Sequence, residues 1–525
     1  MAIFTAIGAA IFGAGTFLAS LTSTVLAIAV NVGLSLLQKA LAGDQSQEPA
    51  GVNGKLQAGG DVPRSFIVGR TCTAGSLAYA NTWGTANKTP NAYFTQVIAL
   101  ADHQISNLTG FWVNDAPVTV DTSNPETDKG YPITEYRKDG KDYLWLKWYD
   151  GTQTTADPFL VASVSSAGRP YESTRVGTGV AYAIVTSRTN TELFSGFPSF
   201  KFEVQGRALY DVSKDTTEGG SGPQRWNDKT TWGGDGDDLP AVQIYNVLRG
   251  IYEANVWLYG LQTITAPRLP AADWIAQIAK CRLEVDGAGQ GVQYLTGGEI
   301  SVDTEIGTAI EKILTGCQGR LIESGGVYKI RVGEPDAAVM SFSDGDILSS
   351  EEQTFTPFFG LSDTINGVTA TYPEPEEAWN TKAAPPIYNP DYEAQDGNRR
   401  LMTSVQMDMV YRSIQVQRVM KAALAEARRA RRHTFIMPPA YWVLEPGDIV
   451  QWTSARNGYV SKLFRVDGIG DGENLDVTVD MTEVDPTDYS WDPDTDYKPP
   501  VFSPVGPVHP PTQVMSGWSV APYTI

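Results

Sequence analysis

The sequence contains almost no cysteine and almost no histidine. Of its 525 residues only three are cysteines, Cys72, Cys281 and Cys317, and three are histidines. The cysteines are odd in number and far apart, so they indicate small buried side chains rather than a disulfide framework or a thiolate metal site. With so few histidines, a zinc centre or a Ser-His-Asp triad lacks its usual parts. This favours a non-enzymatic protein with no metal and no other cofactor.

Positive charge is also scarce. The chain has 40 Lys and Arg against 60 Asp and Glu, which gives a formal net charge of −20. Non-specific nucleic-acid binding depends on basic side chains that replace counterions on phosphates, so this composition argues against it. An acidic surface instead keeps the chain soluble and repels a passing polyanion.

Glycine, proline and aromatic residues are abundant. The chain holds 51 Gly and 32 Pro, and 10% of its residues are aromatic. Short runs of Val, Thr, Tyr and Trp alternate with turn residues, which is typical of strands. The length is sufficient for roughly three or four domains. The predicted fold class is therefore mainly β with α+β inserts.

The N-terminal stretch differs from this body because it has no charge from Ala2 to Gln38. As one helix it would be about 55 Å long, well beyond the roughly 30 Å hydrocarbon core of a bilayer. Small residues recur four apart, as in Ala9 and Gly13, a spacing that lets helices approach closely. A membrane anchor and a segment hidden in an assembly both stay open, whereas the lack of Lys or Arg before Lys39 disfavours a secretory signal.

Composition shifts divide the chain into seven predicted parts. Pro and Gly clusters mark most of the borders. The parts are a hydrophobic helix (1–43), a polar linker (44–64), a β-domain with an insertion near 121–180 (65–215), an α/β domain (216–345), an acidic strand and loop region with a basic helix (346–440), a small barrel-like segment (441–485) and an acidic, Pro-rich connector (486–525).

Local signals predict individual elements. Asn114-Asp115 lies between apolar runs and predicts a hairpin turn, and Ser324-Gly325-Gly326 predicts a second one. One helix is predicted to begin near Pro240 with Asp238 as its cap, and another after Pro270.

The segment after these helices is predicted to be a compact strand–helix–hairpin unit. A strand is expected over 291–297, and a helix is expected to follow it and to end at Gly316. Together with the second hairpin, these elements form the predicted small α/β domain.

The longest amphipathic helix is predicted over 412–434. It carries seven basic residues and a single acid, Glu426, between Arg412 and Arg432. An apolar stripe is expected along Val416, Met420, Ala423, Ala427 and Ala430. A nucleic-acid helix is conceivable, but the net charge favours pairing with the protein's own acidic surface.

Two acidic clusters imitate calcium-binding loops. The sequence DPDTDY starts like an EF-hand loop but lacks its glycine and its distal glutamate, so a solvated acidic linker is the better interpretation. The same interpretation is given to a second cluster. The residues concerned are Asp492, Asp494 and Asp496, and Asp235, Asp237 and Asp238.

A pair of carboxylates, Glu445 and Asp448, raises the alternative of glycoside hydrolysis. The intervening Pro446 and Gly447, directly before a strand, instead have the composition of a turn. A structural role for Pro446, Gly447 and Asp448 is therefore expected.

Several tryptophans look exposed and are numerous enough for a binding face. A carbohydrate-binding surface and an oligomer interface are both consistent with them, and the second is favoured. They are Trp83, Trp112, Trp145, Trp148, Trp226 and Trp232.

The order of the segments resembles a known family. FKFEVQGRALYD is followed by WNDKTTW and LPAVQIYNVLRG, then LPAADWIAQIAKC, then YLTGG with AIEKILTGCQGRLIESGGVYKIRVG, then the basic helix and EPGDIVQW. This order, over roughly residues 60–485, resembles the central tail hub of long-tailed bacteriophages, the lambda-type (J-type) tip attachment proteins, and is similar to the hub of gene transfer agents.

The resemblance implies a structural homotrimer, built of small β-barrels and α/β inserts, that closes the distal end of the tail tube in the virion. It implies contacts with a distal tail protein, other tail-tip proteins and the tape-measure protein, and a host receptor reached through a downstream fibre. It also implies that residues 486–525 lead into a fibronectin-like domain, and that DNA passes the hub without being specifically bound.

The apolar N-terminus departs from the lambda-type pattern, which begins with a polar segment. Three copies of the predicted helix would bury one another and contact the tape-measure protein as a plug in the tube, and the same surface would contact a membrane on infection. The residues predicted for this plug are Gly8, Gly13, Gly15, Leu18, Leu21 and Leu26. Two alternatives stay open: a membrane-anchored bacterial surface adhesin, and a tail-associated glycan hydrolase.

Overall fold

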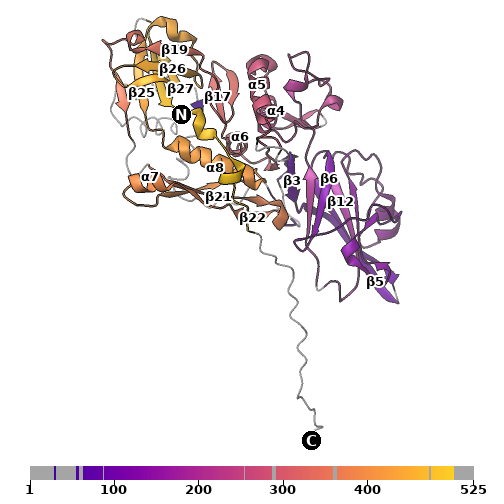
Figure 1. Ribbon diagram of the computed structural model, residues 1–525. Coiled ribbons are helices and arrows are strands. Elements are labelled where there is room, and N and C mark those ends of the chain that lie inside the picture. The colour runs from indigo at the N-terminus through magenta and orange to yellow at the C-terminus, as the bar shows by residue number, and fades with distance from the viewer. Residues whose placement is uncertain are drawn as a thin grey trace, which may run out of the picture.

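A computed structural model of the chain describes residues 29–30, 52, 55–57, 63–86, 88–194, 196–253, 255–285, 291–358, 364–471 and 475–501 (Figure 1). Short strands in several sheets dominate, and the helices are few, so the predicted mainly β class with α/β inserts is confirmed. Among the described residues, no helix is long and apolar enough to cross a bilayer.

The first unit consists of two antiparallel sheets that pack on a shared core. One sheet has the order β4-β5-β12-β11-β8 and the other the order β3-β13-β6-β7. The predicted hairpin turn is confirmed, because Asn114 and Asp115 both have positive φ between β6 and β7. The strands are β3 (Arg70–Thr73), β4 (Ser76–Ala86), β5 (Thr89–Ala101), β6 (Asn107–Val113), β7 (Ala116–Pro117), β8 (Tyr131–Pro132), β11 (Leu144–Tyr149), β12 (Ala181–Arg188) and β13 (Phe200–Gln205).

The α/β unit follows directly and shares strand pairing with the first unit. Its β16 pairs with β2, which comes just before β3 in the chain, and Gly69 lies at the crossing with a φ of +60°. A Cβ at Gly69 would lie 2.2 Å from the carbonyl oxygen of Thr296, so only glycine fits there. The elements are β2 (Ser65–Val68), α4 (Pro240–Arg249), β14 (Ile251–Glu253), β15 (Val256–Tyr259), α5 (Ala271–Cys281), β16 (Gly298–Ser301), α6 (Ile306–Thr315), β17 (Arg320–Ser324) and β18 (Val327–Arg331).

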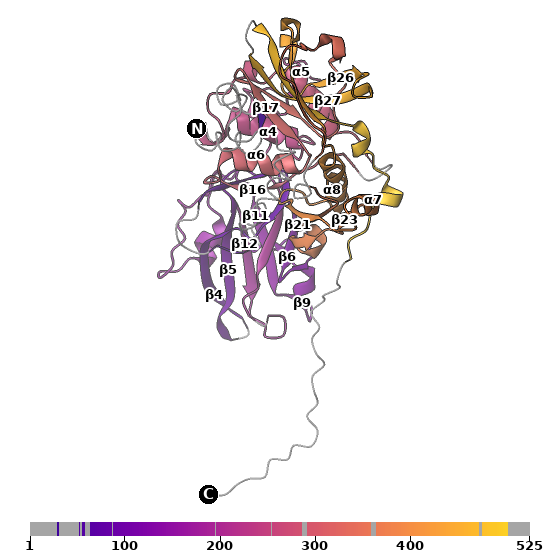
Figure 2. The same cartoon turned by 90° about the vertical axis from the view of Figure 1, so that its left-hand side faces the viewer.

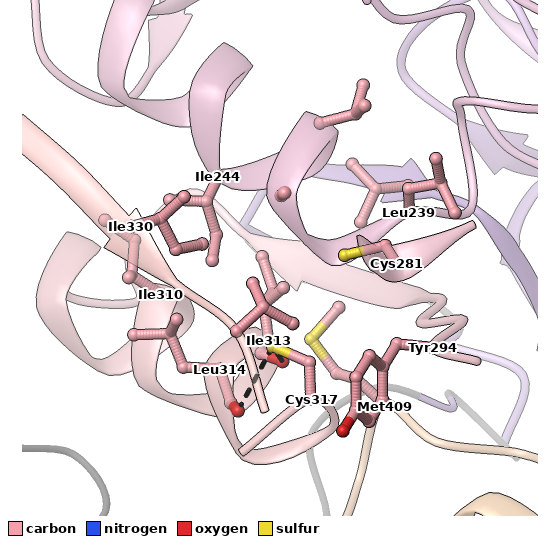
Figure 3. Packing of buried hydrophobic residues seen from close by; sticks show 14 of the residues in the cluster. Leu239, Ile244, Cys281, Tyr294, Ile310, Ile313, Leu314, Cys317, Ile330 and Met409 are labelled. Carbon is pink, nitrogen blue, oxygen red and sulfur yellow. Dashed lines mark hydrogen bonds between the residues drawn. The ribbon is translucent and has the colours of Figure 1, made fainter. Parts of the chain in front are cut away.

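The core of the α/β unit forms where the apolar faces of its helices meet β18. Figure 3 shows Ile244, Ile310 and Ile313 beside Ile330, with Cys281 and Cys317 among them. The helix predicted after Pro270 is α5, and its Trp274 and Cys281 are fully buried as its amphipathic pattern indicates. The glycine turn between β17 and β18 is confirmed as well.

The C-terminal half contains two further sheets and the helix α8 between them (Figure 1). One sheet has the order β19-β26-β27-β28-β25-β20, and in the other β21 pairs with β22, β23 and β24. Figure 2 shows the six-stranded sheet and the α/β unit above the first unit, with the β21 sheet beside the upper part of the first unit. The elements are β19 (Met340–Ser343), β20 (Thr354–Thr356), β21 (Gly367–Glu374), β22 (Asn380–Ala383), β23 (Ile387–Tyr388), α7 (Pro390–Gln395), β24 (Met402–Gln406), α8 (Ser413–Ala427), β25 (Arg432–Met437), β26 (Ile449–Ser454), β27 (Tyr459–Asp471), β28 (Val477–Glu483) and α9 (Pro493–Asp496).

The expected small β-barrels are not closed among the described residues. The six-stranded sheet ends in two edge strands, β19 and β20, which are not paired with each other.

The basic helix is shorter and more deeply buried than its pattern predicts. α8 ends at Ala427, because the alternation from Arg432 onward makes β25, which pairs with β28. Val416 and Met420 are buried as expected, but so are polar residues on other sides of the helix, and Ala423, Ala427 and Ala430 are only half-buried. α8 is thus a central helix packed on several sides, not a surface helix with one apolar stripe.

Two local predictions in the α/β unit are wrong. Residues 294–297 form no strand, because their backbone N–H groups donate in turn to Cys281, to the side chain of Gln415, to Asp238 and to Met409. α4 is not capped by Asp238, because this carboxylate accepts from the backbone N–H of Arg70 at 2.7 Å instead.

The tryptophans predicted to be exposed pack within the chain. None of the six is exposed, and Trp112 and Trp145 are buried. Trp83 stacks on Tyr93, and Trp226 lies against Trp232 with ring centroids 5.2 Å apart. The aromatic pattern therefore reports intramolecular packing, because large rings fill the wide gaps between sheets.

From the apolar N-terminal stretch the structure describes only Ala29 and Val30. They form β1 (Ala29–Val30), which pairs antiparallel with Ile322 and Leu321 of β17. At these two residues a strand replaces the predicted helix, because the free edge of β17 offers unpaired backbone groups. The rest of the helix predicted over 1–43 lies outside the described residues.

Candidate functional site

The described residues contain no site with the parts of a metal or thiol centre. No group of three or more His, Cys, Asp or Glu among them is placed to hold a metal ion. The three cysteines are free and buried, as expected, and burial raises the pKa of the Cys281 thiol to about 12. Burial also lowers the pKa of His433 to about 4, and its ring stacks on Phe355. These side chains serve packing.

The polar centre of the molecule is instead a carboxylate on α8. Glu426 forms ion pairs with Arg320 of β17 and with Arg465 of β27, the latter at 3.0 Å. The two arginine side chains are only 9% and 5% exposed. Gln318 and Tyr489 donate to the second oxygen of Glu426 at 3.2 and 3.3 Å. One carboxylate thus joins the α/β unit, α8, the six-stranded sheet and the segment after it.

The two arginines determine the charge state of Glu426. Burial works to raise the pKa of its carboxyl, but the charges and hydrogen bonds of Arg320 and Arg465 outweigh burial and lower the pKa to about 2. Glu426 is therefore ionised at neutral pH. A small cavity beside it is also lined by Arg331, Asp485 and Tyr489.

A second buried carboxylate joins the first unit to the β21 sheet. Glu203 of β13 accepts from Arg70 Nε at 2.7 Å, from Thr109 Oγ1 at 2.7 Å and from Trp379 Nε1 at 3.0 Å. The neighbouring Lys201 donates to the carbonyl oxygen of Ala378 at 3.0 Å. The first unit is therefore fixed to the C-terminal half by charge-assisted hydrogen bonds.

A groove of about 880 Å³ lies where the first unit, α6 and the β21 sheet meet. Asp102, Glu299, Lys312 and Trp379 are among its lining residues, together with Gln57 from the predicted linker. Gln57 pairs with the start of β4 through two backbone hydrogen bonds of 3.0 and 2.7 Å. Gln57 thus contributes to the wall of the groove, where Ser65 Oγ also donates to Oε1 of Glu299 at 2.6 Å.

The predicted turn at Pro446, Gly447 and Asp448 lies at the seam between the six-stranded sheet and the α/β unit. Gly447 has a φ of +87°, and a Cβ there would lie 2.1 Å from Cδ1 of Ile322. Asp448 accepts from the backbone N–H of Glu445 at 2.9 Å, which closes the turn. The backbone of the turn therefore packs directly against the β17–β18 hairpin, and a side chain at position 447 would not fit between them.

The two carboxylates weighed for glycoside hydrolysis are engaged in this seam. Glu445 forms an ion pair with Lys329 of β18, and Asp448 lies 3.8 Å from Arg331. Burial raises the pKa of Asp448. Both contacts are directed at the neighbouring hairpin.

The two acidic clusters have different roles from those expected. Asp237 is only 3% exposed and accepts from the backbone N–H of Leu209 at 2.9 Å, so describing it as a solvated linker is wrong. Burial raises its pKa to about 7. Asp492 caps the short helix α9, and Asp496 forms an ion pair with Lys421 at 2.6 Å. The cause is the same in both clusters: internal donors compete with water for the carboxylates.

The basic residues of the α8 region pair with the protein's own acids, as predicted. Arg428 forms a pair with Asp396 at 3.0 Å, and Arg429 forms one with Asp488. These pairs occupy guanidinium groups that a nucleic acid would need. The residues predicted for the N-terminal plug, Gly8, Gly13, Gly15, Leu18, Leu21 and Leu26, lie outside the described residues.

Residues 305–469 match the sequence model of the family Phage-tail_3, described as putative phage tail protein. The matched stretch includes β17, α8 and most of β27, and therefore all three charged partners of the Glu426 junction. Over this stretch the chain is similar to phage tail proteins. The resemblance to phage tail proteins that the segment order indicates is thereby confirmed, and a structural role in a phage-type virion is supported.

The fold of the chain is similar to that of a chain in a solved virion. A chain from the virion of a native gene transfer agent particle aligns with a TM-score of 0.52 and 18% identity, over 93% of this chain and 97% of that chain. No curated protein matches the sequence.

Two prophage tail proteins align much more weakly. The 43 kDa tail protein of prophage MuSo2 from Shewanella oneidensis gives a TM-score of 0.28 at 8% identity, over 82% of this chain and 95% of that one. Prophage tail protein gp18 from Listeria monocytogenes gives 0.26 at 8% identity, over 77% and 87%.

Sequence reasoning noticed Glu426 only as the single acid in a basic helix. It did not single out Arg320, Arg465 or Glu203, because their partners are about 40 to 180 residues away in the chain. In the sequence, only the position of Glu426 among many basic residues indicated this site, since such a position favours an ion pair within the protein.

Replacing Glu426 by Gln should lower the free energy of unfolding by about 3 kcal/mol at neutral pH, because two nearly buried arginines would lose their counter-charge. Since the folded pKa is depressed from 4.5 to about 2, the stabilisation by Glu426 is complete above pH 4.5 and is lost as the pH falls toward 2. Urea unfolding at pH 7 and at pH 3 measures both effects. The matched control is Glu393→Gln, which removes a more exposed pair with Arg400; an equal loss in the two variants would contradict the junction.

Replacing Gly447 by Ala should lower the free energy of unfolding by about 2–4 kcal/mol, because the left-handed backbone is strained and the new Cβ meets Ile322. Gly458→Ala is the control, since Gly458 has a φ of +68° but no atom within 4 Å of an added Cβ. That variant should lose only about 1 kcal/mol from backbone strain. Thermal unfolding of the two variants side by side would show whether the contact with Ile322 matters.

Proposed function

We propose that this chain is the central hub of a phage-type tail tip, located at the distal end of the tail in the virion. In this role a homotrimer closes the tail tube, connects it to a receptor-binding fibre and opens for DNA passage on infection. The observation that carries the proposal is the likeness over 93% of the chain to a chain of a gene transfer agent virion, joined to the tail-family match over residues 305–469.

The way in which the units are joined supports this role. A hub transmits force between a tube and a fibre, and its units must not move independently under load. Here Glu426 ties the α/β unit to the six-stranded sheet, and Glu203 ties the first unit to the β21 sheet. Removing one partner from a buried ion pair of this kind costs much free energy, because the other charge stays buried without a counter-charge.

The charge of the chain supports passage of DNA without binding. The net charge is −20, and basic side chains around α8 are paired with acids of the same chain. A wall with a net negative charge gains little from the release of counterions on DNA. DNA would therefore be repelled weakly along the whole path and held nowhere.

The proposed neighbours follow from the same role. They are a distal tail protein, other tail-tip proteins and the tape-measure protein, with a host surface receptor contacted through the downstream fibre. The uncharged stretch from Ala2 to Gln38 is proposed to plug the tube between the three copies, and to contact a membrane when the tail opens.

The trimer is tested by measuring the solution mass of a variant lacking residues 1–43, in the absence of detergent. The hub proposal expects three chain masses, independent of concentration above the micromolar range. A membrane-anchored adhesin would be supported instead if the variant is a monomer and only the full-length chain binds detergent.

The plug is tested in virions that carry the same deletion. Loss of the plug should leave tails that assemble but release their DNA before contact with a host, measured as free DNA in purified particles. A control with Gly8, Gly13 and Gly15 changed to Leu keeps the stretch apolar but blocks close helix packing. Intact, infectious particles from the deletion would rule out a plug over 1–43.

A further inference from the structure

The segment after β28 lies along α8 as a strap. It is defined here as residues 485–501, which the composition marks only as an acidic, Pro-rich connector. Val484 is still buried and pairs with Leu463 in the six-stranded sheet. Beyond it the chain leaves the sheet and runs antiparallel to α8, from the end of the helix toward its start.

Besides the hydrogen bond from Tyr489 to Glu426, three sets of contacts hold the strap along α8, from just past its C-terminal end to its first turns. Arg429 donates to both carboxylate oxygens of Asp488, at 2.8 Å for Nε to Oδ2 and 2.5 Å for Nη2 to Oδ1. Lys421 donates to Asp496 at 2.6 Å. These charged pairs sit near the C-terminal end and the middle of α8.

The third set is a pair of hydrogen bonds near the start of the helix. Gln417 Nε2 donates to the carbonyl oxygen of Lys498 at 2.7 Å, and the backbone N–H of Lys498 donates back to Gln417 Oε1 at 2.9 Å. Beyond them, Lys382 of β22 donates to the carbonyl oxygen of Val501 at 2.9 Å. The described chain ends there, on the α7 and β23 side of the molecule (Figure 2).

The strap is held by polar contacts and not by a core. None of residues 485–501 is fully buried, whereas the strand before it, β28, buries Val477, Val479 and Met481. The two charged pairs differ in exposure: the side chains of Lys421 and Asp496 are 34% and 22% exposed, whereas those of Arg429 and Asp488 are 23% and 8% exposed. The more exposed pair contributes little and weakens as salt increases.

We propose that residues 485–501 form a releasable strap, which detaches from α8 as a unit while the six-stranded sheet stays folded. Attached, the strap ends at Val501 beside β22. Detached, it is held only at the end of β28, at the other end of α8. The distance from Gln417 to Arg429 along a helix is about 18 Å, so the last point at which the described chain is fixed to the body moves by roughly that length. The strap is independent of the tail-hub proposal and holds for any role of the chain.

Hydrogen exchange of the full-length chain, read by mass spectrometry, tests the strap. Replacing Lys421 by Met should speed exchange in peptides covering 486–500 about three- to tenfold, because its polar contacts are with Asp496 and the ring of Trp491. Peptides covering β25 and β28 should not change. Arg429→Met should have a larger effect on the same peptides, since it removes the bidentate pair with Asp488.

Two controls separate release from general destabilisation. Arg64→Met removes an exposed ion pair with Asp102 in the first unit and should leave the strap peptides unchanged. In the unmodified chain, raising NaCl from about 0.05 to 1 M should speed exchange more in 486–500 than in β25 and β28, because screening acts on the partly exposed pair of Lys421 and Asp496. If 486–500 and β28 change by the same factor in Lys421→Met and in salt, or if neither changes, the strap is not releasable and the proposal is wrong.

Discussion

The ionised carboxylate of Glu426, held between two nearly buried arginines, is the interaction on which the arrangement of the C-terminal two-thirds depends. It is made by α8, but its partners come from the β17–β18 hairpin and from β27. An ion pair of this kind has little tolerance for displacement, because desolvated charges must stay in contact to offset the cost of their burial. The position of each element is therefore constrained by the other two. Tyr489 adds the start of the strap to the same point.

This constraint explains how an acidic chain with few cations uses them. Several basic residues lie where separate parts of the fold meet. These are Arg70 in the first unit, Arg320 and Arg465 beside Glu426, and Arg429 beside the strap. Each meets a carboxylate from a distant part of the chain. The excess of acid gives the chain its formal net charge of −20.

The predictions that were confirmed concern short-range chemistry. The turn at Asn114-Asp115 needs positive φ, which these residue types tolerate, and α5 follows from a single apolar face that includes Trp274. The wrong ones concern residues whose partners are remote. Asp238 is predicted to cap a helix because it precedes Pro240, but its carboxylate instead accepts a hydrogen bond from the backbone N–H of Arg70. Residues 294–297 look like a strand, yet each backbone N–H finds a different partner.

The candidate site divides in the same way. The sequence by itself determined the fold class, the glycine turn at Gly447 and the expectation that the basic helix pairs with internal acids, because these depend on backbone preferences and on net charge. Only the tertiary structure decided that Glu426 is the meeting point, that Asp237 is buried and that residues 485–501 lie on α8. The physical reason is that the residues next to a carboxylate do not decide whether it is solvated or paired with an arginine far away in the chain. The outcome depends on where the strands and helices place the two groups.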